Sequence, residues 1–190
     1  MSDVSAITDL TGKLLIAMPG MGDPRFEHGL VYICAHSAEA AMGLIVNKPA
    51  SDVTMSMLLE QLSIEPLVDM RGKCVYVGGP VEQARGFVLH TSDYASNSST
   101  IEVDSFRMTA TLDILEDIAA GTGPEKRIVT LGYAGWGAGQ LEAELTQNAW
   151  LVCDATEELV FDTPDPEKWQ AALASIGVPA LALSAAGGRA

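Results

Sequence analysis

The three histidines of this chain are the first candidates for a general base, because imidazole titrates closest to neutral pH. His36 follows the apolar run 30–35 and His90 follows the apolar run 86–89, so each is expected at the end of a strand. A strand end can present a polar side chain to a ligand or hold it in a local hydrogen bond. Neither a Gly-x-Ser-x-Gly nucleophile elbow nor a His-x-x-x-His metal pair accompanies them. We therefore expect structural histidines, with a base at a ligand site as the alternative.

Three further polar side chains stand beside predicted strands. Asp23 lies between Gly22 and Pro24, where an Asx-turn is the simplest role for its carboxylate. Arg85 precedes the run 86–89 and is a scarce cation in an acidic chain, so its planar fork could hold an anionic ligand or pair with a neighbouring carboxylate. Asn47 comes before Lys-Pro at the end of another strand, where its amide is expected to cap backbone groups.

A glycine-dense segment, residues 131–142, joins an apolar run to an amphipathic run. Residues 127–131 predict a strand, and the apolar spacing over 138–147 predicts a helix. The glycines would then lie where a strand passes to a helix N-terminus, as in anion-binding loops. The segment up to that helix has no Lys, Ser or Thr, and Glu142 and Glu144 would repel a phosphate there. A tight turn is the preferred interpretation, and a phosphate loop is the alternative.

The aromatic side chains of this segment fit a tight turn, because glycines would let Tyr133 and Trp136 pack against the backbone. We expect Trp136 to point inward, with part of its ring left at a surface groove. A positive φ or a close backbone approach is expected at Gly135, Gly137 or Gly139. Gln140, which follows these glycines, joins Trp136 among the candidate ligand-binding residues.

Composition excludes some classes of partner. The chain has 190 residues and a formal net charge of −14, from 11 Lys and Arg against 25 Asp and Glu. Its length suits one domain over 1–190, with 1–9 and 185–190 expected to be flexible. The cations are scattered along the sequence, and Lys126-Arg127 is the closest pair. Proteins bind duplex DNA largely by neutralising phosphates with cations, so direct DNA binding is disfavoured, as is an anionic membrane surface.

Cys34, Cys74 and Cys153 are far apart, and each lies in an apolar run, so buried free thiols are expected. Their spacing fits no metal site, and no cofactor is predicted. The sequence shows neither a signal peptide nor an apolar run long enough to span a bilayer. We therefore expect a cytoplasmic protein.

The pattern of the chain favours an α+β fold, a single domain with a largely antiparallel sheet packed against helices, because strands and helices do not alternate strictly. The runs 30–35 and 42–47 are almost continuously apolar, which predicts strands covered on both faces. Residues 94–99 are expected to form a mobile loop and 180–190 to fray. Strands are predicted at 13–18, 30–35, 42–47, 74–77, 86–90, 127–131, 150–153 and 159–161, with a hairpin of 100–103 and 106–108. Helices are predicted at 54–62, 112–119, 138–147 and 165–176, the last with Asp165 as N-cap and Pro166 at its first position.

Ordered blocks of sequence also carry a family resemblance. They are Leu10–Pro19, Met21–Phe26, Val31–His36, Met42–Pro49, Gly78–Val81, Arg85–His90, Leu131–Trp136 and Gly139–Glu142. Together they resemble the AlgH/YqgE family of small bacterial proteins over about residues 10–185. The resemblance implies the AlgH-like fold, a single α+β domain with sheets packed against helices. It also carries the description of a transcriptional regulator, drawn from a genetic association with alginate control, and it implies no catalytic residue set.

Two hypotheses of function follow. The first is a cytoplasmic regulatory or binding protein that acts through a protein or small-molecule partner without catalytic turnover. The second is a nucleotide- or anion-binding enzyme that uses the strand-end polar groups and the glycine-rich segment. Convergence of the polar groups on one deep pocket would favour the enzyme, whereas dispersal into local hydrogen bonds would count against it. The candidate ligand-binding residues are Asp23, His36, Asn47, Arg85, His90, Trp136 and Gln140.

Overall fold

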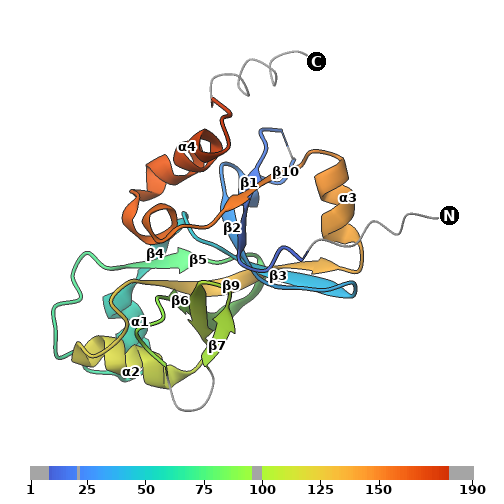
Figure 1. The fold of residues 1–190 in the computed structure, drawn as a ribbon. Coiled ribbons are helices and arrows are strands. Elements are labelled where there is room, and N and C mark those ends of the chain that lie inside the picture. Colours follow the sequence, from blue (N-terminus) through green and yellow to red (C-terminus); the bar gives the residue numbers. More distant parts are fainter. Residues whose placement is uncertain (1–8, 21, 96–99, 180–190) are drawn as a thin grey trace.

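A curled ten-stranded sheet forms the centre of the molecule in the computed structural model, which describes residues 9–20, 22–95 and 100–179 (Figure 1). Its main path runs β10-β1-β2-β3-β9-β6-β8-β7, and β4 and β5 join it through β9. All pairings are antiparallel except that of β5 with β9. The strands are β1 Lys13–Ala17, β2 Leu30–His36, β3 Ala40–Ile45, β4 Pro49–Thr54, β5 Cys74–Val77, β6 Val81–His90, β7 Thr100–Val103, β8 Phe106–Thr109, β9 Arg127–Gly137 and β10 Trp150–Asp154.

Helices cover the sheet in three places (Figure 1). The short helix η2 and α4 lie over one face of β1 and β2, and α3 lies over the other face. Helices α1 and α2 cover the part of the sheet that contains β5, β6 and β9. The helical elements are η1 Pro24–Phe26, α1 Met55–Gln61, α2 Leu112–Ala120, α3 Gln140–Thr146, η2 Glu158–Asp162 and α4 Asp165–Ser175.

Strand β2 is buried on both faces, as its continuous apolar run predicts. Leu30 and Tyr32 point into the core under α4, whereas Val31 and Ile33 point into the core under α3. All four side chains are inaccessible to solvent. Because successive side chains of a strand point to opposite faces, a run without polar residues indicates that both faces are covered.

Strand β9 corrects the prediction for the glycine-rich segment. The strand does not end at Leu131 but continues to Gly137, and α3 begins only at Gln140. Its first half pairs with β5 and β6, and residues 134–137 pair with β3. The backbone is held extended by these ladders, which the local glycine content does not reveal. Of the three glycines predicted to need special geometry, Gly139 has a positive φ of 71°.

Two other predictions were wrong, and one strand was missed. Residues 159–161 lie in η2 and not in a strand, and β4 has no counterpart among the predicted strands. Helix α4 has Pro164 and not Asp165 at its N-cap, so the carboxylate of Asp165 is free to bind Lys168 at 2.8 Å. The predicted flexibility of the chain ends (except Asp9) and of most of the loop 94–99 concerns residues outside the described part of the chain.

Candidate functional site

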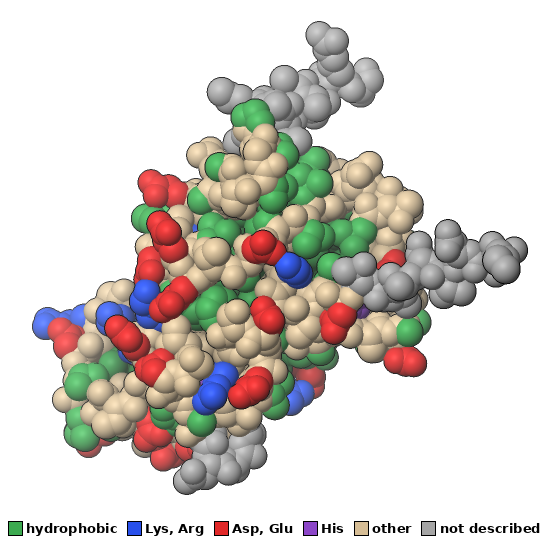
Figure 2. Space-filling model, viewed as in Figure 1, with side chains coloured by type: hydrophobic (Ala, Val, Ile, Leu, Met, Phe, Trp, Pro, Cys, Tyr) green, Lys and Arg blue, Asp and Glu red, His purple; other side chains and the backbone are tan. Residues whose placement is uncertain are grey.

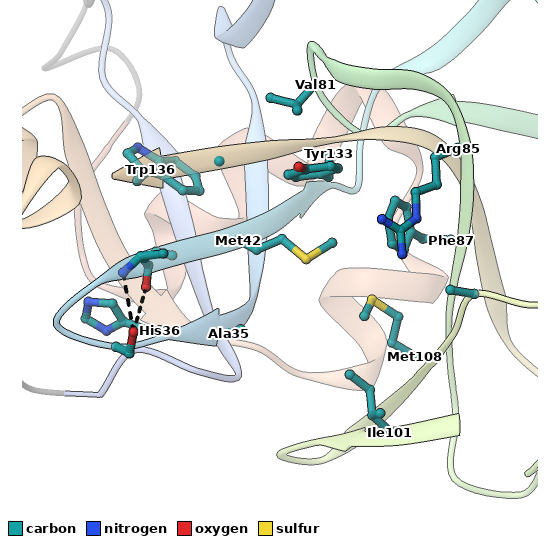
Figure 3. Close-up of a pocket in the computed structure, with 15 residues that line it drawn as sticks. Ala35, His36, Met42, Val81, Arg85, Phe87, Ile101, Met108, Tyr133 and Trp136 are labelled. Atoms are coloured by element: carbon teal, nitrogen blue, oxygen red, sulfur yellow. Dashed lines mark hydrogen bonds between the residues drawn. The ribbon is translucent and has the colours of Figure 1, made fainter. Parts of the chain in front are cut away.

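A cleft of about 740 Å³ opens between the β2–β3 hairpin, β9 and the β6–β8 pair. Figure 3 shows side chains from these separate strands pointing into one space. The lining is mainly apolar and aromatic, with few polar groups at its edge. The lining residues are Ala35, His36, Ser37, Ala40, Ala41, Met42, Val81, Arg85, Phe87, Ile101, Met108, Ala110, Tyr133, Gly135 and Trp136.

The apolar wall of the cleft consists of side chains that β3, β6, β8 and β9 each direct toward the same space. Met42 on β3 and Met108 on β8 face each other across the space, and Phe87 on β6 meets Tyr133 on β9 edge-to-face, with ring centroids 5.8 Å apart (Figure 3). Gly135 carries no side chain at the point where a bulkier residue would approach the Tyr133 ring. The cleft therefore stays open beside β9.

Arg85 supplies a positive charge at this apolar wall. Its guanidinium lies 5.1 Å from the centroid of the Phe87 ring, which favours a cation over the ring face. The carboxylate of Glu82 approaches the guanidinium only to 3.5 Å, and the Arg85 side chain is 57% exposed. The pKa of the Tyr133 hydroxyl is raised first by its own loss of solvent and then by this Glu82 carboxylate. Because its ion pair with Glu82 is long and its side chain is largely exposed, the Arg85 guanidinium is free to contact a ligand in the cleft.

His36 lines the cleft but is fixed by two hydrogen bonds. Its Nδ1 accepts the backbone N–H of Leu10 at 3.0 Å, so the ring proton lies on Nε2, which donates to the Glu142 carboxylate at 2.6 Å. This bond is the main cause that lowers the pKa of Glu142. The His36 side chain is only 2% exposed. Its role in this arrangement is to join the end of β2 to α3.

Trp136 is an inward-facing residue whose ring reaches the cleft, as predicted. It is 5% exposed and meets Trp150 edge-to-face, with centroids 6.0 Å apart. The carboxylate of Glu144 lies beside both indoles. Burial raises the pKa of Glu144, and the neighbouring indoles of Trp136 and Trp150 offset that shift only in part; among the described residues, neither Glu144 Oε2 nor Trp150 Nε1 has a hydrogen-bond partner.

The remaining predicted residues lie in local hydrogen bonds away from the cleft. His90 is fully buried, its Nδ1–H donates to the Thr91 carbonyl at 2.8 Å, and burial lowers its pKa. Asp23 forms the predicted Asx-turn by accepting the N–H of Arg25 at 3.0 Å.

Asn47 and Gln140 also bind backbone. Asn47 accepts the N–H of Leu30 at 2.9 Å and donates to the carbonyl of His28 at 2.8 Å, which joins β2 to the segment that follows β3. Gln140 accepts the N–H of Gly137 at 3.0 Å. The structure therefore brings together His36, Arg85 and Trp136 but not the other candidates.

Most of the apolar cleft residues were not predicted. Met42, Met108 and Ile101 belong to runs that the sequence identifies only as strands. The methionines within these runs were the one signal that could have indicated a binding surface, because methionine side chains adapt to different ligands. Methionine is just as common in a hydrophobic core, so the signal does not distinguish the two roles.

The cysteine prediction is right at two positions and wrong at one. Cys34 and Cys153 are buried free thiols, but Cys74 is an exposed one. Cys74 begins β5 beside a turn, so its apolar neighbours do not enclose it. Across the ranges that the structure describes, no group of three His, Cys, Asp or Glu side chains is arranged to hold a metal ion. None of the described helices is both long and apolar enough to cross a membrane.

Comparison with known proteins gives the family. A family model described as AlgH-like matches residues 14–181. The chain belongs to the AlgH-like family. Among the relatives of this AlgH-like chain, a UPF0301 protein of Ruegeria pomeroyi is 57% identical over 184 residues, which cover 96% of this chain and 100% of the relative. A UPF0301 protein of Caulobacter vibrioides is 50% identical, with 95% and 94% covered.

Solved structures agree on the fold. The solution structure of the AlgH protein from Pseudomonas aeruginosa matches with a TM-score of 0.78 and 45% identity, over 100% of both chains. The crystal structure of a Corynebacterium diphtheriae protein matches with a TM-score of 0.66 at 20% identity, over 84% of this chain and 83% of that one, and shows the fold alone. The predicted family and the predicted α+β class are both confirmed.

Proposed function

We propose that this AlgH-like protein is a binding protein whose cleft takes a small molecule with an apolar body and one acidic group. The observation that carries the proposal is the position of the Arg85 guanidinium over an apolar, aromatic wall. The cleft, at about 740 Å³, lies within the usual size range of small-molecule sites. Apolar contact would provide affinity, and the guanidinium would pair with a carboxylate.

The two methionines support a ligand of flexible shape. Met42 and Met108 come from different strands and meet over the same space (Figure 3). Unbranched thioether side chains adapt to the outline of a ligand and make favourable contacts with aromatic rings. A hydrocarbon or aromatic body attached to an acid would suit this wall.

Binding without turnover accounts for the polar groups better than catalysis does. Both ring nitrogens of His36 are occupied within the protein, and the Ser37 hydroxyl accepts the N–H groups of Glu39 and Ala40 at 3.2 and 3.3 Å. These groups therefore shape the edge of the cleft. Asp23, which lines a separate pocket, and the buried His90 lie elsewhere. This dispersal counts against the enzyme hypothesis.

In the proposed role the protein works in the cytoplasm, and ligand binding controls its contact with a protein partner. The cleft includes exposed side chains on two strands, Val81 and Ile101, so a bound ligand would change the surface that a partner meets. The net charge of −14 disfavours a direct contact with DNA. Any effect on transcription would then be indirect.

Isothermal titration with phenylbutyrate and phenylbutanol tests the proposal. The two probes share an apolar body, and only the first carries a carboxylate. We expect saturable binding of phenylbutyrate and much weaker binding of phenylbutanol. The substitution Arg85→Met keeps the packing of the side-chain stem and removes the charge, and we expect it to weaken phenylbutyrate binding about tenfold.

Arg25→Met is the matched control for this experiment. Arg25 is 62% exposed and also pairs with a nearby carboxylate, that of Asp23, but it does not line the cleft. The Arg25→Met variant should bind phenylbutyrate with the same affinity as the unmodified protein. The proposal is overturned if phenylbutyrate does not bind saturably, if phenylbutanol binds equally well, or if the two Arg variants lose affinity alike.

A further inference from the structure

A second pocket, of about 330 Å³, lies where β5 and β9 begin, and it shares none of its lining residues with the cleft. Three of the scattered cations of the sequence meet here, namely Lys73, Lys126 and Arg127. The parallel pairing of the two strands explains the meeting. Tyr76 lies opposite Thr130, so Lys73, just before β5, and Arg127, the first residue of β9, both come to line this pocket.

Lys73 and Arg127 form no ion pair within 4 Å in the described part of the chain, although Lys73 interacts with the Asp69 carboxylate at longer range. Lys126 bridges Asp162 at 2.6 Å and Glu157 at 3.2 Å, and most described Lys and Arg side chains pair in a similar way. Arg127 is partly buried, and its Nη1 donates only to the carbonyl of Pro124, at 3.2 Å. In a chain with more than twice as many acids as bases, two neighbouring cations without an ion pair are unexpected. Their mutual repulsion would be relieved by an anion.

The remaining lining of the pocket points to an organic anion. Met55, Val129 and Phe161 present apolar surface beside the cations, and Tyr76 adds an aromatic ring. Paired cations suit the charge of a phosphate, and Arg binds phosphate oxygens with its fork. We propose that this pocket binds a small phosphate monoester, with the phosphate between Lys73 and Arg127 and its organic group on the apolar side.

Titration calorimetry with phenyl phosphate tests this site through opposite changes of charge. Lys73→Gln removes an exposed cation that lines the pocket, and we expect about tenfold weaker binding. Glu125→Gln removes a carboxylate that lines the pocket, and we expect tighter binding. Arg25→Gln is the control, since Arg25 is 62% exposed, pairs with Asp23 and does not line the pocket. It should leave the affinity unchanged.

Alkylation of Cys74 gives an independent measurement, because this exposed thiol also lines the pocket. Saturating phenyl phosphate should slow the reaction of Cys74 with the uncharged reagent N-ethylmaleimide, and phenylbutyrate should not. The proposal is overturned if phenyl phosphate does not bind saturably, if Lys73→Gln and Arg25→Gln lose affinity alike, or if alkylation is not slowed. None of these results depends on whether the cleft binds phenylbutyrate.

Discussion

The side chains around the cleft divide into those that hold its shape and those that can reach a ligand. His36 and Trp136 belong to the first group, because one is fixed at both ring nitrogens and the other is packed against Trp150. Arg85 and Met42 belong to the second group, since neither is buried and both project into the cleft (Figure 3). Substitutions in the first group should change stability, and those in the second should change binding.

Trp136→Ala should lower the free energy of unfolding by about 3–5 kcal/mol, because a large buried ring would leave a cavity. Urea unfolding monitored by circular dichroism gives this value. Trp136→Phe retains much of the buried surface and should cost less. An alanine variant as stable as the unmodified protein would show that the ring contributes no core packing.

The thiols should differ in reactivity with Ellman's reagent. Cys74 should react at once in the folded protein, whereas Cys34 and Cys153 should react only on unfolding. Burial raises the pKa of Cys34 to about 12 and that of Cys153 to about 11, which suppresses the reactive thiolate. Cys74→Ser should abolish the fast reaction. Fast labelling that persists in this variant would contradict the assigned burial.

The histidines show why single-residue roles were hard to predict. His36 and His90 both end apolar strands, yet one reaches the cleft and the other lies in the core beside Thr109. The difference depends on which strands lie next to each strand end. Local sequence does not contain that information, whereas the Asx-turn of Asp23 is local and was predicted correctly.

Among the elements, α3 carries two carboxylates with opposite environments. Glu142 bonds to His36 on one side of the helix, which lowers its pKa. Glu144 lies against the indoles of Trp136 and Trp150, and burial raises its pKa. The same helix therefore contains one carboxylate that favours the fold when ionised and one that opposes it.

Glu142→Gln and Glu144→Gln should change stability in opposite directions near pH 7. The folded protein lowers the pKa of Glu142, so its contribution is present above its unfolded pKa and is lost as the pH falls through the folded value. The folded protein raises the pKa of Glu144, so the stabilising contribution of this residue is present below its unfolded pKa and is lost as the pH rises through the folded value. Glu142→Gln should therefore destabilise, and Glu144→Gln should stabilise. Urea midpoints measured from acidic to neutral pH should show both differences shrinking in acid; parallel shifts would contradict this.

Strand β9 requires glycine where it passes close to another backbone. Gly132 has a φ of 77°, and a Cβ there would lie 2.4 Å from the carbonyl oxygen of Gly79. Gly132→Ala should cost at least about 1–3 kcal/mol in urea unfolding, the usual range for strained backbone. Gly137→Ala is the control, because its Cβ would meet only the Gln140 side chain, at 4.0 Å. Equal costs would contradict a specific requirement at Gly132.

The elements most faithfully predicted were those with strong local signals. The predicted helices 54–62 and 112–119 correspond to α1 and α2; the structure adds that Thr54 caps α1 through the N–H of Met57 and that α2 ends at Gly121 with a left-handed φ. Strand β4 was missed because it is polar and largely exposed, so it lacks the apolar pattern of a strand. The cleft could not be predicted as a whole, because it depends on which strands become neighbours.

For the whole molecule, charge sets the expected partners. Acidic side chains spread over the face shown in Figure 2, with fewer basic ones between them. We expect no sub-micromolar affinity for duplex DNA at about 150 mM salt, since binding requires cations to replace counterions. Fluorescence anisotropy with a labelled duplex measures this. Saturable, sequence-specific binding at nanomolar protein would contradict it.

The position of β9 in the chain has a consequence for folding during synthesis. The meander β1–β3 and the strands β6–β8 are made before residue 127, but β9 is the strand that pairs with both groups. A nascent chain that has not yet released β9 from the ribosome leaves the edges of β3 and β6 without this partner, and open strand edges are prone to intermolecular pairing. Strand β9 must therefore emerge before the two groups of strands can join, and protection by a chaperone would matter most in that interval.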